Sequence, residues 1–122
     1  MNNTAEDKQI IEKIVEGIQD VKGKKIVVVD MTQLDNYTCG YFVICEGESS
    51  TQVNSIAENI KDHVREELRV KPFAVDGMMN AEWVAMDYGN IIVHVFQPEA
   101  RAFYQLETLW EDAALNEIPD VD

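Results

Sequence analysis

The chain is poor in basic residues: 10 Lys and Arg stand against 23 Asp and Glu, which gives a formal net charge of −13. Proteins that bind nucleic acids usually carry a basic patch, and repulsion from phosphates would work against association here. The charge balance therefore argues against direct nucleic-acid readout and favours a basic protein partner. Acidity that serves solubility alone is the alternative explanation.

Cysteines and long apolar runs are also scarce. Cys39 and Cys45 lack the paired spacing of zinc and redox motifs, so we expect free thiols, with Cys45 packed in the core. No apolar stretch reaches membrane-spanning length, and the start MNNTAEDKQ lacks the basic and apolar regions of a secretory signal. We expect a cytoplasmic protein with no membrane contact, no metal and no cofactor.

The spacing of apolar residues predicts alternating helices and strands. In chain order we expect a helix from Thr4 to about Gly23, strands at 25–31 and 41–46, a helix from Ser49 to about Arg69, strands at 73–75, 82–88 and 91–96, and a helix opened by Pro98. Gly89 and Asn90 would close a two-residue hairpin between the last two strands. These elements predict an α/β fold with a mixed β-sheet of about five strands flanked by helices. We expect a single domain over residues 1–113 and an acidic, flexible tail over residues 114–122.

Alternation along the strand at 82–88 separates two sets of side chains. Trp83, Ala85 and Asp87 share one face, and Val84, Met86 and Tyr88 share the other. Trp83 and Tyr88 are large aromatic residues with a polar group, the type enriched at interface hot spots, and we expect Tyr88 to project from the rim of the sheet. Core packing is the alternative for each of them.

The last helix contains both an apolar stripe and polar residues. Phe103, Leu106 and Trp110 form the expected inward stripe, with Leu109 beside it. Arg101 has no acidic residue three or four positions away, so its charge could orient Asp87, contact a partner or be solvated. The division of Arg101, Tyr104 and Trp110 between core and interface stays open.

The sequence offers little for catalysis. Residues 47–49, Gly-Glu-Ser at a strand-to-helix junction, are similar to the phosphate-holding turn of nucleotidyltransferases, but such enzymes also need a carboxylate pair on the neighbouring strand to hold two metal ions. The only Asp-x-Asp is Asp120 and Asp122 in the tail. His94 lies in an apolar run, which predicts that it is a core histidine. We expect it to be hydrogen-bonded to a carboxylate or to backbone, with Asp87 as one candidate partner. We expect no catalytic residues.

Two segments, GYFVICEGESSTQV and WVAMDYGNIIVHVFQPEARAFYQLETLW, resemble the iojap family, whose bacterial members are ribosomal silencing factors. The resemblance covers roughly residues 7–113. Its most specific positions are Tyr41 to Cys45, Gly47, Ser49, Gln52, Trp83, Asp87 to Gly89, Val93 to Val95, Arg101, Phe103, Tyr104, Leu106, Glu107, Leu109 and Trp110. The family usually has Asp before the Tyr-Phe pair, whereas this chain has Gly40.

The resemblance implies a nucleotidyltransferase-like architecture without the catalytic carboxylates, in a protein that is not an enzyme. It implies that the protein binds the fourteenth protein of the large ribosomal subunit. Such binding would keep the small subunit from joining and so repress translation. The partner-binding residues it implies are Trp83, Asp87, Tyr88, Gly89, Arg101 and Tyr104. Two other functions stay open: a large-subunit assembly factor and a nucleotide-binding relic of a transferase. The sequence also leaves open whether the free protein forms a homodimer through the same aromatic surface.

Overall fold

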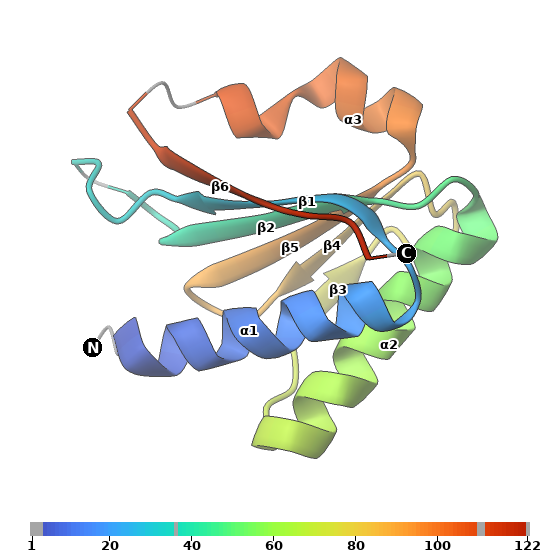
Figure 1. Ribbon diagram of the computed structural model, residues 1–122, viewed down its shortest axis with the longest axis horizontal. Coiled ribbons are helices and arrows are strands. Elements are labelled where there is room, and N and C mark those ends of the chain that lie inside the picture. Colours follow the sequence, from blue (N-terminus) through green and yellow to red (C-terminus); the bar gives the residue numbers. More distant parts are fainter. Residues whose placement is uncertain (1–3, 36, 110–111, 122) are drawn as a thin grey trace.

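The computed structural model describes residues 4–35, 37–109 and 112–121. A six-stranded mixed sheet, in the order β3-β4-β5-β2-β1-β6, has two long helices on one face and a short helix on the other (Figure 1). The elements are α1 (Thr4–Asp20), β1 (Lys24–Asp30), β2 (Tyr41–Glu46), α2 (Ser50–Leu68), β3 (Ala74–Asp76), β4 (Trp83–Asp87), β5 (Ile91–Phe96), α3 (Pro98–Tyr104), the 3-10 helix η1 (Leu106–Thr108) and β6 (Ala114–Ile118). The predicted α/β class with a mixed sheet is confirmed.

Helix α2 begins and ends close to where the sequence predicts. The Ser49 side chain accepts a hydrogen bond from the Gln52 N–H at 3.1 Å, and the Gln52 side chain accepts one from the Glu48 N–H at 2.7 Å. This reciprocal pair satisfies two N–H groups that the first turn would otherwise leave unpaired. At the other end, Arg69 adopts a left-handed φ of 60° and stops the helix.

The centre of the sheet is the parallel pair β2–β5, and the other neighbours are antiparallel. The β4–β5 hairpin closes with a hydrogen bond of 2.8 Å from the Tyr88 N–H to the Ile91 carbonyl. Gly89 has a φ of +92°, which a residue without a Cβ adopts at little cost. The predicted two-residue turn is therefore present.

Apolar side chains fill both faces of the sheet. On the α1–α2 face, Ile14, Ile56, Val84 and Val93 belong to the larger core and are fully buried. The helices approach closely because α1 has Gly17 at the crossing, where a Cβ would lie 3.1 Å from the Ile60 Cα. The second, smaller core lies on the α3 face and comprises Val27, Val29, Met31, Cys39, Phe42, Ile44 and Phe96.

Strand β6 corrects one prediction. Residues 114–118 do not form a flexible tail; they pair with β1 in antiparallel register from Ile26 opposite Ile118 to Asp30 opposite Ala114. Beyond β6, the Asp120 carboxylate accepts a hydrogen bond of 2.7 Å from the Lys25 N–H at the start of β1. The segment ALNEI was missed because an edge strand with four exposed residues out of five shows no apolar run.

Candidate functional site

Aromatic side chains gather at one end of the α3 face. The Trp83 ring, at the start of β4, lies 5.1 Å from Phe96 at the end of β5 and 4.6 Å from Tyr104 on α3, measured between ring centroids. Trp83 is half-buried, Phe96 is fully buried and Tyr104 is exposed over 45% of its surface. The order of burial runs from the sheet outward, so Trp83 and Tyr104 form the accessible side of a cluster anchored in the core.

His94, on β5, contacts the Trp83 ring of this cluster. Its Nδ1 accepts a hydrogen bond of 3.0 Å from the Trp83 indole N–H, which places the ring proton of a neutral histidine on Nε2. That Nε2 is buried without a hydrogen-bond partner among the described residues. Burial lowers the pKa of His94 to about 4, so the ring is neutral at pH 7. The predicted core histidine is confirmed, but its partner is Trp83 rather than Asp87.

Asp87 and Gly89 lie at the opposite end of β4 from Trp83. The half-buried Asp87 carboxylate accepts a hydrogen bond of 2.7 Å from the Gly89 N–H, an interaction typical of an aspartate that stabilises a turn. Trp83, Ala85 and Asp87 are all half-buried on the α3 face, as alternation predicts. They form a strip that the short helix leaves partly open.

Tyr88 does not lie on this strip. It is only 6% exposed and belongs to the core on the α1–α2 face, so the expectation that it projects from the rim is wrong. Burial raises the pKa of its phenol, and the hydroxyl oxygen has no hydrogen-bond partner among the described residues. Alternation correctly placed Tyr88 opposite Trp83, but a residue next to a turn is exposed only if nothing covers its face.

Arg101 is also buried, with 7% exposure. Its Nη1 donates to the Lys25 carbonyl at 2.6 Å and lies 3.4 Å from the Glu46 carboxylate, and its Nε donates to Glu107 at 3.2 Å. The guanidinium therefore connects α3 to β1, β2 and η1, which accounts for its charge without a partner. Sequence spacing missed this arrangement because Glu46 lies 55 positions away along the chain.

The expected inward stripe of the last helix is only partly present. Phe103 is 79% exposed and Leu109 is 57% exposed, whereas Leu106 packs against the smaller core. The stripe fails because α3 ends at Tyr104 and Gln105 takes a left-handed φ of 47°, so helical spacing does not continue into η1. Trp110 lies outside the described residues.

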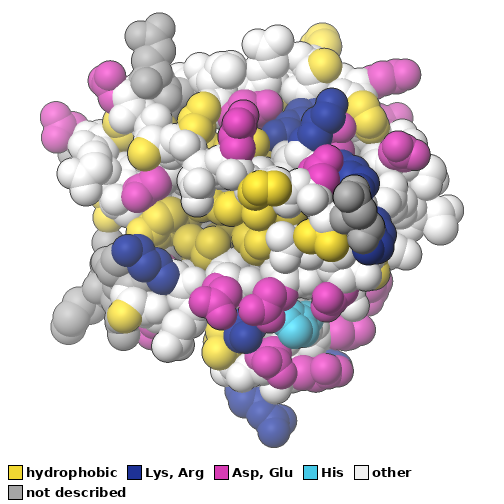
Figure 2. Space-filling model, in the orientation of Figure 1, with side chains coloured by type: hydrophobic (Ala, Val, Ile, Leu, Met, Phe, Trp, Pro, Cys, Tyr) yellow, Lys and Arg dark blue, Asp and Glu magenta, His cyan; other side chains and the backbone are white. Residues whose placement is uncertain are grey.

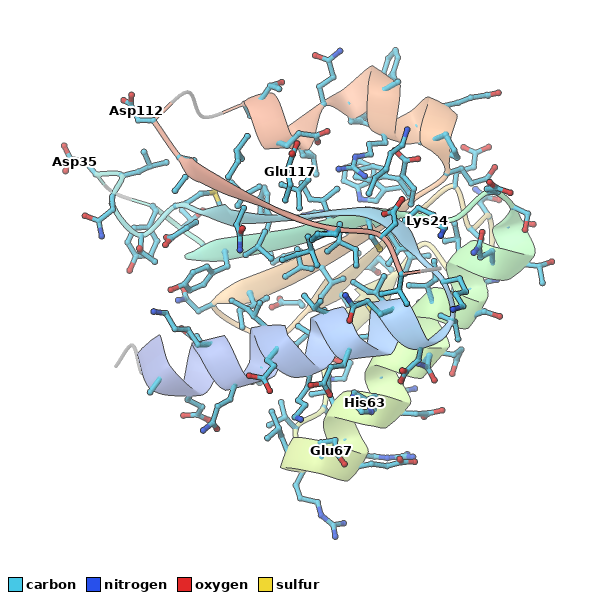
Figure 3. The ribbon with its side chains drawn as sticks, in the orientation of Figure 1. Lys24, Asp35, His63, Glu67, Asp112 and Glu117 are labelled. Carbon is cyan, nitrogen blue, oxygen red and sulfur yellow. The ribbon has the colours of Figure 1, made fainter. Side chains whose placement is uncertain are left out.

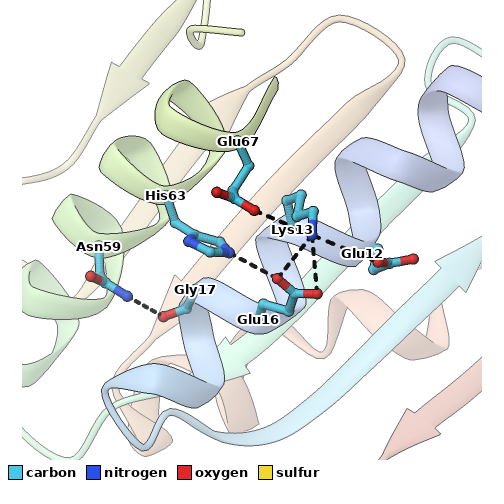
Figure 4. Close-up of polar contacts among 7 residues, drawn as sticks. All are labelled: Glu12, Lys13, Glu16, Gly17, Asn59, His63 and Glu67. Atoms are coloured by element: carbon cyan, nitrogen blue, oxygen red, sulfur yellow. Dashed lines mark hydrogen bonds and ion pairs between the residues drawn. The ribbon is translucent and has the colours of Figure 1, made fainter. Parts of the chain in front are cut away.

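The described residues offer no evident reaction centre. They contain no group of three or more His, Cys, Asp or Glu side chains able to hold a metal ion. Both cysteines are free thiols and Cys45 is buried, as predicted; Cys39 is buried as well, and burial raises the pKa of Cys45 to about 12. His63 pairs with Glu16 between the two long helices at 2.9 Å, beside the ion pairs of Lys13 (Figure 4). The N-terminus of α2 is occupied by its own capping box.

None of the described helices is long and apolar enough to cross a membrane.

Gly40 departs from the pattern expected at its position, and the neighbouring Asn90 explains how the chain accommodates it. The Gly40 N–H donates to the Asn90 side chain at 2.9 Å, and a Cβ at position 40 would lie 2.4 Å from the Asn90 Nδ2. That Nδ2 in turn donates to Asp7 at 2.9 Å. The Asn90 amide fills the space in which a larger residue 40 would stand.

Comparison with known proteins identifies the family. The family model described as ribosomal silencing factor during starvation matches residues 4–122. A ribosomal silencing factor of Bacillus subtilis is 37% identical over 91% of this chain and 92% of its own length. A mouse protein named for mitochondrial assembly of the ribosomal large subunit is 28% identical over 82% of this chain but only 44% of its own length.

A solved structure agrees with the sequence relatives. The crystal structure of a Chromobacterium violaceum protein matches with a TM-score of 0.79 and 30% identity, covering 85% of this chain and 85% of that chain. Likeness to nucleotidyltransferases stays a prediction. The family model spans almost the whole chain, β6 included, and the chain therefore belongs to the ribosomal silencing factor family.

Proposed function

We propose that this protein binds the large ribosomal subunit through its fourteenth protein and thereby keeps the small subunit from joining. The observation that carries the proposal is the exposed aromatic pair Phe103 and Tyr104 beside half-buried Trp83 on the open α3 face. Large aromatic side chains exposed together are unusual on a monomer surface and are enriched at interface hot spots. Family membership supports a ribosome-related role.

The proposed contact surface joins the β4 strip of Trp83, Ala85 and Asp87 to Phe103 and Tyr104 of α3. These five residues are called the aromatic strip below. Its members come from β4 and α3, and all of them retain solvent exposure. Rigid aromatic rings lose little conformational freedom on binding, and Asp87 supplies a negative charge at the far end of β4. Tyr88 and Arg101 leave the proposed surface because they are buried, and Gly89 acts through the turn that orients Asp87.

Charge favours a protein contact over an RNA contact. A chain with a formal charge of −13 is attracted to a basic protein and repelled by the phosphates around it. Silencing of this kind needs only occupancy of a site that the small subunit must cover, so no bond is made or broken and no cofactor is required. The same role places the protein in the cytoplasm with the ribosomes.

The test is binding of purified large subunits by Phe103→Ala and Tyr104→Ala variants. These exposed side chains contribute less to the core than Trp83, so their removal separates binding from folding. We expect at least tenfold weaker binding for Tyr104→Ala, about 1.4 kcal/mol, and a matching rise in joined ribosomes when both subunits are mixed at fixed magnesium.

Met79→Ala is the control, since Met79 is a large apolar side chain that is 99% exposed but belongs to the loop between β3 and β4 and not to the strip. It should bind and silence like the parent protein. Full silencing by a folded Phe103→Ala, Tyr104→Ala double variant would disprove the proposed surface.

A role in large-subunit assembly is the second candidate, and the name of the mouse relative favours it. Deletion of the gene should then cause precursors of the large subunit to accumulate, whereas a pure silencing role would leave their profile unchanged. Nucleotide binding is a weaker candidate, because the capping box occupies the α2 N-terminus. Titration with nucleotides tests it directly.

A further inference from the structure

The edge strand β6 is exposed between two grooves. β6 pairs with β1 on one side only and forms the edge of the sheet opposite β3. In Figure 1 it crosses the front of the molecule between α1 below and α3 above. Figure 2 shows hydrophobic side chains gathered in the middle of this surface, with Asp and Glu side chains around them. In the sheet order, β5, β2 and β1 separate β6 from β4 with its half-buried Trp83, Ala85 and Asp87.

The two grooves lie on opposite faces of the sheet. The lower groove, of about 530 Å³, lies between α1 and the β1–β6 margin and has apolar walls that include Ile11, Val15 and Ile118. The upper groove, of about 930 Å³, lies between α3–η1 and the same margin and includes Glu107 and Glu117. A strand added beside β6 would send alternate side chains into the two grooves.

The upper groove is suited to positive charge. Glu117 is exposed on the side of β6 that faces α3, as Figure 3 shows, and it forms no ion pair with the described residues. The Oε1 of Glu107 accepts from Arg101, but its Oε2 is buried with no hydrogen-bond partner in the described part of the chain. The groove is lined by four carboxylate residues and two basic ones, namely Glu46, Glu107, Glu117 and Asp120 against Lys25 and Arg101. An incoming ammonium or guanidinium group would therefore meet an excess of carboxylates, with Glu117 the exposed one.

The strand has few of the usual protections of a sheet edge, since Glu117 is its one charged residue. Its residues, Ala-Leu-Asn-Glu-Ile, include no lysine or proline, and its pairing with β1 has no bulge. Natural proteins commonly use such features to stop an edge from accepting another strand. A second copy of this chain is a poor occupant, because two molecules with a formal charge of −13 repel each other.

From these observations we propose that β6 is a docking edge for an extended segment of a basic protein, in which basic side chains that face α3 alternate with apolar side chains that face α1. The segment would extend the sheet by one strand, with main-chain hydrogen bonds to β6 and side chains in both grooves. This proposal does not depend on the aromatic strip or on the ribosomal role.

The test uses a fluorescent peptide of alternating lysine and valine, about eight residues long, which is an ordinary strand length. We expect saturable binding to the full chain and slower hydrogen exchange of amides in residues 114–118. Binding should weaken steeply with added salt, since the contact combines exposed charges. A peptide of alternating glutamate and valine should not bind, and proline in place of the central valine should abolish binding.

Glu117→Lys and Glu58→Lys form a matched pair of variants. Both glutamates are exposed and both changes alter the net charge equally, but Glu58 lies on α2, far from β6. We expect Glu117→Lys to weaken peptide binding at least about tenfold and Glu58→Lys at most about twofold. Equal effects of the two changes, exchange protection confined to the β4 region, or self-association that itself protects residues 114–118 would each overturn the proposal.

Discussion

The two faces of the sheet solve the same packing problem differently. On the α1–α2 face, helices of 17 and 19 residues cover a core whose side chains are nearly all apolar. On the α3 face, a helix of seven residues covers only one end, and the buried set there includes His94 and Arg101. The short helix leaves Trp83, Ala85 and Asp87 half-buried. The short helix therefore leaves part of this face accessible, and the buried His94 and Arg101 make hydrogen bonds within the protein.

The largest expected effect tests how completely helices α1 and α2 bury the side chains on their face of the sheet. Tyr88→Asp places a carboxylate in an apolar core and should destabilise the fold by about 4 kcal/mol or more. Tyr88→Phe is the control and should change stability by less than about 1 kcal/mol, because the lost hydroxyl has no hydrogen-bond partner in the described part of the chain. Urea unfolding measures both, and an unchanged midpoint for Tyr88→Asp would contradict the assigned burial.

On the α3 face, the pairing of Arg101 is expected to be structural. Arg101→Leu leaves Glu46 and Glu107 without their shared cation and should destabilise the protein by about 3 kcal/mol. Binding of large subunits, corrected for the folded fraction, should not change. A stable Arg101→Leu protein that fails to bind would instead assign the guanidinium to the partner surface.

The buried histidine makes the stability of the α3 face depend on pH. Burial lowers the pKa of His94 from 6.5 to about 4, so between these values the unfolded chain takes up a proton that the folded protein does not. Stability from this group is complete above pH 6.5 and is lost as pH falls toward 4, by about 3 kcal/mol.

Urea unfolding at a series of pH values gives this slope. His94→Gln should remove most of it, whereas His63→Asn should retain it. Glu16, whose pKa is lowered chiefly by its hydrogen bond to His63, loses its contribution as pH falls below its ordinary value of 4.5. An unchanged slope in His94→Gln would show that another group is responsible.

The smallest expected effect concerns the outside of α3. Phe103→Ser removes a side chain that is 79% exposed and should change stability by no more than about 0.5 kcal/mol. Thermal unfolding checks this value. A larger loss would mean that Phe103 supports the helix, and the contrast between a closed face and a partner-accessible face would then be weaker.

Local sequence patterns predicted the central elements well. The β2 bounds at 41–46 and the β5 bounds at 91–96 agree with the structure, because strands buried on both faces leave continuous apolar runs. The Ser49 capping box and the Gly89 turn were also predictable, since each depends on residues close together in the chain. Strand β6 was not, because its pairing with β1 joins residues far apart and leaves most of its side chains exposed.

The sequence by itself determined the order of the elements, the opposite directions of Trp83 and Tyr88, and the acidic character of the surface. The tertiary structure decided which of those two aromatics stays accessible to solvent, because exposure depends on the helix that covers each face. It also decided that Arg101 pairs with Glu46 and Glu107 and that His94 accepts from Trp83. Burial and pairing arise from contacts between distant segments, and the spacing of residues along one segment carries no record of them.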